Sequence, residues 1–343
     1  MKRKIVLYGG YAADAYNADT VASNEHCSGS ETALMRVAEE LAKNRDNEVI
    51  VVTRPIIEGT FRGVKHMDFE TYSDYQRDNE IDVLIISRYI HYILDFKMAK
   101  KNYLWLHDTH IQQWWNFQEI NHIALGRNVY KLFDAIVCVS EWHRDYVIDQ
   151  YCTDAQDMGM FKCIRNGIEL DNFYDVDVSK KQKGKIVFNC RKSGLQEAVN
   201  FLSEYRQHVP EAELHVFGAN VGLEDIEGDL TNVFDRGYVS NKEIIDELAS
   251  AEYWINPSTF VETSCIAAIE AQLCKAIPII LPWGGLKETT ASYFVVDDPN
   301  LMHNLTKFGV TYGDVDEMIE VNYNHAASHT WERAAAQFSQ LFS

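Results

Sequence analysis

The sequence has no long hydrophobic run and few cysteines. No apolar stretch approaches the roughly 18 residues that a membrane-spanning helix requires. The short run "IVLY" near the start precedes two glycines, and it predicts a first β-strand rather than the apolar region of a signal peptide. The seven cysteines form no C-x-x-C pair, which favours reduced thiols in a cytosol over a disulfide framework or a zinc site. We therefore expect a cytoplasmic protein without a transmembrane segment.

Basic residues are also scarce. The 32 lysines and arginines are outnumbered by 51 aspartates and glutamates, which gives a net charge of −19 that is concentrated in the second half of the chain. Such a surface repels nucleic acid and anionic lipid, so neither is an expected partner. The absence of a polybasic helix also disfavours an acceptor at a lipid surface.

Apolar residues are plentiful, and short runs of them alternate with amphipathic stretches. With 343 residues, of which 46% are hydrophobic, the chain can form two cores. Several runs are apolar on both faces, as in parallel strands that helices cover. The amphipathic pattern of Glu31–Asn44 predicts a helix between two of them. In the first half, the expected strands are Ile5–Tyr8, Val49–Thr53, Val83–Ser87, Tyr103–His107 and Ala135–Ser140.

A polar segment, Asn166–Lys185, interrupts this alternation and predicts a linker. Beyond it a helix is expected at Leu195–His208. The repeated strand–helix units predict an α/β protein with two Rossmann-like domains, whose parallel sheets face a central cleft. Ligands of such sheets gather at the carboxyl ends of the strands. In the second half, the expected strands are Lys185–Asn189, Leu214–Phe217, Asn232–Phe234, Tyr253–Asn256 and Ile277–Leu281.

Two glutamates, Glu262 and Glu270, flank an otherwise apolar run in "FVETSCIAAIEAQLCKAIP" (Phe260–Pro278). A helix that begins near Glu262 would separate them by roughly 12 Å and by about 80° in direction. That distance is too large for a glycosidase carboxylate pair or a shared metal ion. It suits one long ligand whose phosphates meet the helix N–H groups at Thr263, Ser264 and Cys265, as in a nucleotide sugar. Alternatively, Glu262 caps the helix dipole and Glu270 faces solvent.

The segment Pro257–Thr289 resembles the signature of glycosyltransferase family 4, whose members are retaining enzymes with the GT-B fold. The match includes the two glutamates, the preceding Pro257 and Ser258, and the turn Gly284–Gly285. "SGSETALMRVAEEL" (Ser28–Leu41) is similar to the family's first-domain "GGSE" loop and helix, with Ser28 in place of the first glycine. Further similar segments are Ala135–Val147, Ile164–Phe173, Val209–Gly218 and Arg236–Ile244.

The resemblance implies a role for each matching residue. Glu262 would contact the hydroxyls of the donor sugar, and Glu270 those of the ribose. The backbone from Thr263 to Ile266 would bind the diphosphate. Gly29 would allow the backbone to approach the donor phosphate closely.

Arg191 and Lys192 are the expected cations for the departing nucleotide diphosphate. The family usually has an arginine and a lysine several residues apart in this loop, with a glycine after the lysine. In "NCRKSGL" the two are adjacent and Ser193 precedes Gly194. Which of the two contacts the phosphate is therefore open, and a solvated pair at a strand end is the alternative.

His107 stands where the family has a histidine near the anomeric centre of the sugar. A metal pair with His110 is the alternative that its spacing permits, but two ligands are too few. Trp114 and Trp115 follow closely and could stack on an acceptor sugar, although aromatic residues more often fill a core. No metal ion or cofactor is expected.

The implied protein is a retaining hexosyl- or pentosyltransferase that moves a sugar from a UDP- or GDP-sugar to a glycan or another hydroxyl acceptor. We expect an acceptor-side domain (residues 1–168), a linker (169–184), a nucleotide-sugar-binding domain (185–328) and a C-terminal helix (329–343) that packs back on the first domain. The alternatives are an inactive nucleotide-sugar-binding or scaffolding protein and a nucleotide-sugar epimerase. A nicotinamide dehydrogenase would need G-x-G-x-x-G, which "YGGYAAD" lacks.

Overall fold

The computed structural model describes residues 2–10, 15–22, 28–90, 98–111, 122–189, 193–218, 222–308 and 312–343. The chain divides into two compact units. The first unit holds Met1–Gly167 together with Trp331–Ser343, and the second holds Ile168–Thr330. Within the described residues, no helix combines the length and the apolar character that a membrane crossing needs.

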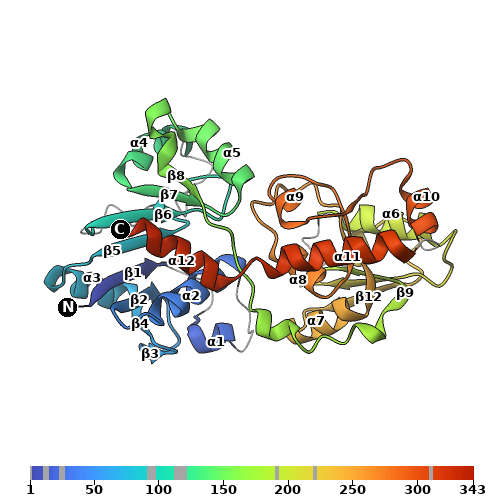
Figure 1. Ribbon diagram of the computed structural model, residues 1–343, viewed down its shortest axis with the longest axis horizontal. Helices are drawn as coiled ribbons and strands as arrows, with labels where there is room; N and C mark the ends of the chain where they lie inside the picture. The colour runs from blue at the N-terminus through green and yellow to red at the C-terminus, as the bar shows by residue number, and fades with distance from the viewer. Residues whose placement is uncertain are drawn as a thin grey trace. The chain divides into compact units, whose positions relative to one another are not determined.

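In its described residues the first unit is built on an eight-stranded sheet in the order β3-β4-β2-β1-β5-β6-β7-β8 (Figure 1). The pairs are parallel except β3 with β4, which form an antiparallel hairpin. The strands are β1 (Arg3–Tyr8), β2 (Asn47–Thr53), β3 (Gly59–Phe61), β4 (Val64–Asp68), β5 (Val83–Ser87), β6 (Lys101–Trp105), β7 (Ala135–Cys138) and β8 (Phe161–Cys163). The helices are α1 (Ala18–Ala22), α2 (Gly29–Ala42), α3 (Phe69–Asp78), α4 (His122–Val129), α5 (Glu141–Tyr151) and α12 (Trp331–Leu341).

The second unit has a six-stranded sheet in its described residues, in the order β11-β10-β9-β12-β13-β14, with parallel pairs throughout. The strands are β9 (Gln182–Phe188), β10 (Glu213–Phe217), β11 (Val233–Gly237), β12 (Ala251–Asn256), β13 (Ile277–Ile280) and β14 (Phe294–Val295). The helices are α6 (Leu195–Tyr205), α7 (Asn241–Ser250), α8 (Ile266–Leu273), α9 (Leu286–Thr289), α10 (Leu301–Phe308) and α11 (Tyr312–Ala327).

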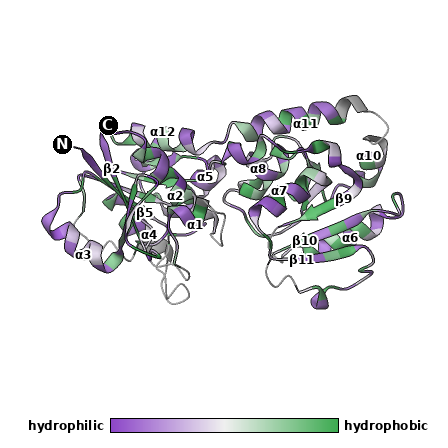
Figure 2. Cartoon of the chain, turned by 90° about the horizontal axis from the view of Figure 1, so that it is seen from below, coloured by the Kyte–Doolittle hydropathy of each residue, from purple (hydrophilic) through white to green (hydrophobic). Residues whose placement is uncertain are grey.

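Central strands of both sheets are buried on both faces. Ile5, Val6 and Leu7 in β1 are fully buried, as are Trp254 and Ile255 in β12. Alternation of polar and apolar residues is therefore absent from these strands, and helices cover both sides of each sheet. Figure 2 shows that helix α3, by contrast, is mainly hydrophilic.

Several expected element boundaries are wrong. The segment expected as a linker contains short 3₁₀ turns at Leu170–Phe173 and Val178–Lys180, and β9 begins at Gln182 instead of Lys185. Strand β6 ends at Trp105, so His107 lies in the following loop. Helix α8 begins at Ile266 and not near Glu262.

Candidate functional site

The loop after β12 is held by its own polar side chains. The Ser258 N–H donates to Asn256 Oδ1 at 3.2 Å, and the Ser258 hydroxyl accepts the Phe260 N–H at 3.0 Å. Ser258 is buried, with 3% of its surface exposed. The chain therefore leaves the carboxyl end of β12 along one defined path towards Glu262.

Glu262 is fixed through its backbone by the turn Gly284–Gly285. The Gly285 N–H donates to the Glu262 carbonyl at 2.6 Å. Gly284 has φ +63°, and a Cβ atom there would overlap the same carbonyl oxygen. Because this oxygen is occupied by Gly285, it does not accept a helical hydrogen bond from Ile266, which explains why α8 starts later than expected. The 12 Å separation expected for a continuous helix therefore does not apply.

The first turn of α8 presents a run of unused donors. Cys265 is the N-cap residue, and in the described part of the chain no acceptor is recorded for the N–H groups of Ser264, Cys265 and Ile266. The Ser264 hydroxyl is buried and likewise has no partner there. Adjacent donors at a helix N-terminus, where the dipole is positive, favour an anion.

Glu270 lies in the second turn of α8 and is partly buried. Burial raises the pKa of its carboxyl group to about 7, and a hydrogen bond with the Asn241 side chain partly offsets this effect. Glu270 is therefore partly exposed and partly buried, which does not fit a fully solvent-facing side chain. The alternative in which Glu262 caps the helix dipole stays a prediction, and Glu262 lies three residues before the N-cap residue, Cys265. Asn241 escaped the sequence analysis because nothing in "SNKEI" indicates that its side chain turns towards another helix.

The loop after β9 contacts β12 and the loop that follows β12. Trp254 Nε1 donates to Asn189 Oδ1 at 2.7 Å, and the hydroxyls of Ser193 and Ser258 lie 2.8 Å apart. A Cβ atom at Gly194, which has φ +107°, would come within 2.8 Å of the Ser258 backbone. Arg191 and Lys192, the expected phosphate-binding cations, lie outside the described residues. Among their described neighbours, Asn189 is hydrogen-bonded to Trp254, and Ser193 and Gly194 lie beside Ser258.

In the first unit, Gly29 is the exposed first residue of α2. The preceding Ser28 N–H donates to Glu31 Oε2 at 2.7 Å, which stabilises the helix start. Ser28, where the family has glycine, is therefore an ordinary N-cap residue in extended conformation. The Ser30 hydroxyl lies 3.3 Å from Arg88 Nη1, which connects the helix start to the end of β5.

His107 follows β6 at the same edge of the sheet and packs on Trp105, with ring centroids 4.6 Å apart. Burial lowers the pKa of His107 to about 3, so its imidazole is neutral at physiological pH. His143 supports this loop: its Nδ1 accepts the Val139 N–H, so its Nε2 donates to the Asp108 carbonyl at 2.9 Å. Trp114 and Trp115 lie outside the described residues.

The sequence analysis overlooked an ion pair beside His107. Arg88 binds Asp108 through two hydrogen bonds, Nε to Oδ2 at 2.8 Å and Nη2 to Oδ1 at 3.1 Å. Arg88 also has φ +68°, a left-handed conformation that is costly for a residue with a side chain. The pair thus joins the ends of β5 and β6 near the start of α2. Neither "ISRYI" nor "HDTH" indicates in sequence that these two residues meet.

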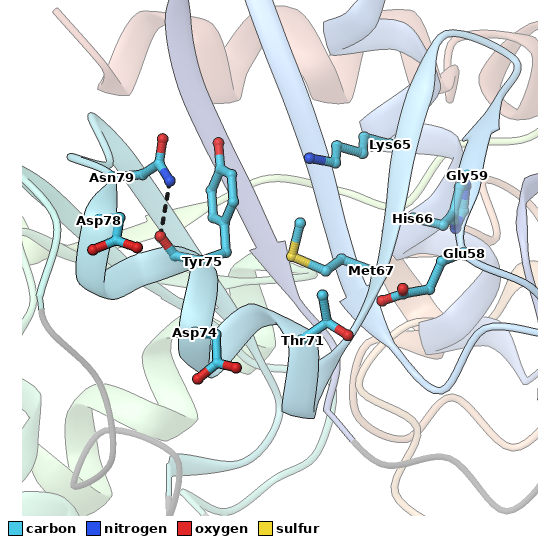
Figure 3. Close-up of a pocket in the computed structure, with 10 residues that line it drawn as sticks. All are labelled: Glu58, Gly59, Lys65, His66, Met67, Thr71, Asp74, Tyr75, Asp78 and Asn79. Carbon is cyan, nitrogen blue, oxygen red and sulfur yellow. Dashed lines mark hydrogen bonds between the residues drawn. The ribbon is translucent and has the colours of Figure 1, made fainter.

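A cavity of about 530 Å³ lies elsewhere in the first unit, between β4 and α3. Figure 3 shows Lys65 and Met67 on β4 pointing towards Tyr75 and Thr71 on α3. The Lys65 ammonium lies 4.8 Å from the centre of the Tyr75 ring. None of the residues predicted from the sequence lines this cavity. Among the described residues, no three His, Cys, Asp or Glu side chains are grouped to hold a metal ion.

No protein family profile matches the sequence. No curated protein sequence matches it either. Solved structures do match. A sucrose-phosphate synthase from Thermosynechococcus elongatus superposes with TM-score 0.74 at 16% identity, covering 99% of this chain and 98% of that chain. HepE from Anabaena, in complex with UDP and glucose, gives TM-score 0.67 at 13% identity, with 98% of both chains covered.

A glycosyltransferase from Rickettsia africae also superposes, with TM-score 0.70 at 14% identity and coverage of 99% of this chain and 98% of that chain. The two parallel sheets and these similarities along nearly the whole chain define the class: the protein has the α/β GT-B fold. The expected fold class is therefore confirmed.

Proposed function

We propose that the protein is a retaining glycosyltransferase. It would transfer a hexosyl or pentosyl group from a nucleotide-diphosphate sugar to a hydroxyl of a glycan or another acceptor. One observation carries this proposal: the unused N–H groups of Ser264, Cys265 and Ile266 and the buried Ser264 hydroxyl lie in sequence between the two carboxylates. This order of groups fits a ligand that has a diphosphate in its middle and hydroxyls at both ends.

The second unit would hold the donor. The N–H groups at the start of α8, with Thr263 contributing from the preceding loop, would bind the diphosphate. Arg191 and Lys192 would neutralise charge on the departing nucleotide. These two cations follow β9, whose neighbouring residues Asn189 and Ser193 contact β12 and the loop that leads to α8. The similarity to a UDP-bound structure supports UDP as the nucleotide, and GDP is the alternative.

The two glutamates would bind the two ends of the donor. Glu270, partly buried and with its pKa raised to about 7, lacks the water that would otherwise stabilise its charge. Two ribose hydroxyls would supply donors to this carboxylate. Glu262, held by the Gly284–Gly285 turn, would accept hydrogen bonds from hydroxyls of the sugar.

The first unit would provide the acceptor side. Neutral His107 would face the anomeric centre, Gly29 would leave space for the donor phosphate, and Trp114 and Trp115 would stack on the acceptor. The acceptor hydroxyl would attack from the face that the nucleotide leaves, with a donor phosphate oxygen accepting its proton. This mechanism needs no metal ion and suits a cytoplasmic enzyme.

The test is release of free nucleotide from a panel of UDP-, GDP- and ADP-sugars without acceptor, since water can replace the acceptor slowly. We expect release from one donor, and loss of at least about 100-fold in the Glu262→Gln variant because a group near the sugar acts in the transition state. Donor affinity should change less in this variant. Glu224→Gln, an exposed carboxylate of the same unit, is the matched control and should remain active.

The other outcomes separate the alternatives. Thermal stabilisation by one nucleotide sugar without any turnover, even with acceptor glycans present, would indicate the inactive binding or scaffolding protein. Turnover to an isomeric nucleotide sugar would indicate an epimerase. Neither stabilisation nor release with any donor would refute a nucleotide-sugar function.

A further inference from the structure

The second unit contains a cavity of about 330 Å³ at the edge where its central strands begin. The cavity is lined by the first residues of β9 and β12, by Lys275 and Ile277 at the start of β13, and by one face of α11. The donor-site loops follow the opposite, carboxyl ends of the same strands. Because β12 has six residues, roughly 20 Å of strand separates the two edges. An occupant of this cavity would therefore not touch the proposed donor site.

The inner wall of the cavity is apolar. Tyr253 is buried at the start of β12, and Ile277 and Phe294 are nearly buried on the neighbouring strands. Val315 and Ile319 contribute from α11. The volume and this mixture of aromatic and aliphatic side chains fall in the range of small-molecule sites.

Three lysines, Lys181, Lys183 and Lys275, stand around this apolar wall. In the described part of the chain none of them has a carboxylate within ion-pair distance. Lys181 Nζ donates to the Ala251 carbonyl at 2.5 Å, and Lys275 Nζ lies 5.6 Å from the centre of the Tyr323 ring. Burial, with repulsion from Lys275 as a smaller cause, lowers the pKa of Lys181 to about 8.

Two carboxylates, Glu252 and Asp316, also line the cavity. Glu252 Oε2 already accepts the Gly184 N–H at 2.6 Å, so part of its hydrogen-bonding capacity is used. The cavity therefore carries a local excess of one positive charge in a protein whose net charge is −19. Unpaired ammonium groups beside an apolar wall attract an anion that also has an apolar part.

We propose that this cavity binds a small molecule in which an anionic headgroup, a phosphate or a carboxylate, is joined to an apolar body. The headgroup contacts Lys181 and Lys275, and the body lies on Ile277, Phe294 and Ile319. The site is separate from the donor site, and the proposal does not depend on the transferase activity.

Calorimetric titration of the full-length protein with phenyl phosphate, benzoate and benzyl alcohol tests this proposal. We expect one of the two anions to bind with a stoichiometry of one and the neutral alcohol to bind at least about tenfold more weakly. The comparison of phenyl phosphate with benzoate identifies the headgroup. Equal binding of the alcohol, or no binding of either anion at millimolar concentration, would overturn the proposal.

Substitution locates the site. Lys275→Gln and Lys181→Gln should each weaken anion binding, Lys275→Gln by about tenfold, since a charged hydrogen bond is lost. Lys180→Gln is the matched control, because Lys180 lies in the same segment, pairs with Asp177 and does not line the cavity. An equal loss of anion affinity in Lys180→Gln would mean that the positive charge of the segment attracts the anion without a specific site in the cavity. That result would refute the proposal. Displacement of the anion by UDP, with no effect of Lys275→Gln, would place it in the donor site and refute the proposal.

Discussion

At the scale of single residues, the raised pKa of Glu270 makes the stability of the folded protein depend on pH. Its carboxyl group has a pKa of about 7 in the folded protein, against about 4.3 in an unfolded chain. Between these values the folded state binds the proton more strongly, so this group destabilises the fold progressively as pH rises from about 4 to 7. The proposed role of Glu270, in which its ionised carboxylate accepts two ribose hydroxyls, would account for this cost.

We predict that Glu270→Gln makes the protein more stable at pH 8 by about 1–3 kcal/mol but leaves its stability almost unchanged at pH 4. The same variant should bind the nucleotide sugar at least about tenfold more weakly. Urea unfolding at both pH values and titration with the donor measure the two effects. Glu224→Gln should show neither. A stability gain that is equal at pH 4 and pH 8 would contradict a raised pKa.

Sequence patterns suggest candidate site residues that lie close together in the chain, and they do not reveal residues that meet partners far along it. The glutamates, the donors around Ser264 and Gly29 all belong to short segments with a recognisable order. The Arg88–Asp108 pair joins two loops, and Asn241 reaches Glu270 from another helix. Such contacts depend on which strands become neighbours, and a single sequence does not encode that directly.

At the scale of elements, the turn Gly284–Gly285 determines where α8 begins. The Gly285 N–H of this turn donates to the Glu262 carbonyl, and residues 262–265 remain outside the helix. The sequence predicted a helix from near Glu262 because the run between the two glutamates is mainly apolar. A competing hydrogen bond from a residue 23 positions downstream cannot be seen in that pattern.

The β3–β4 hairpin was missed for a related reason. Its two-residue turn is Arg62–Gly63, with φ +49° and +82°. Such turns are usually marked by Asn-Gly or Asp-Gly, because both residues need positive φ. An arginine in the first position removes this signal, and the three residues of β3 are too few to show a period.

We predict that Gly284→Ala lowers turnover at least about tenfold by displacing Glu262, because the new Cβ atom would overlap the Glu262 carbonyl. Gly237→Ala is the matched control. Gly237 also has φ +63°, but nothing lies within 4 Å of a Cβ atom there. Both variants should lose about 1 kcal/mol of stability from backbone strain. Nucleotide release and urea unfolding of both variants test this, and equal activities would show that the turn does not position Glu262.

At the scale of the whole molecule, the chain enters the second unit once and then returns to the first. Ile168 pairs with Thr330, and its N–H donates to the His329 carbonyl at 3.0 Å, so the entry and the exit of the second unit are adjacent. Helix α12 then packs on α2 within the first unit (Figure 1). The C-terminal helix α12 thus belongs to the same compact unit as the N-terminal strand β1. The sequence predicted two domains and a C-terminal helix that packs back on the first, and the structure adds that this helix packs on α2.

Phe338 on α12 is fully buried and packs edge-on against Trp105, with ring centroids 4.9 Å apart. The Tyr103 hydroxyl also donates to the Leu341 carbonyl at the end of this helix. We predict that Phe338→Ala destabilises the first unit by about 3–5 kcal/mol, since a large aromatic side chain leaves a cavity beside β6. Hydrogen exchange measured by mass spectrometry should show faster exchange in β1, β5 and β6 and unchanged exchange in β9 and β12.

The exposed Gln340→Ala substitution on the same helix is the control and should leave all these strands protected. Donor binding should survive Phe338→Ala at temperatures where the first unit remains folded, because the proposed donor contacts belong to the second unit. Turnover should fall, because His107 directly follows the strand that Phe338 supports. If exchange rises equally in both units, the two unfold as one cooperative body, and the stability of the first unit cannot be changed without changing that of the second.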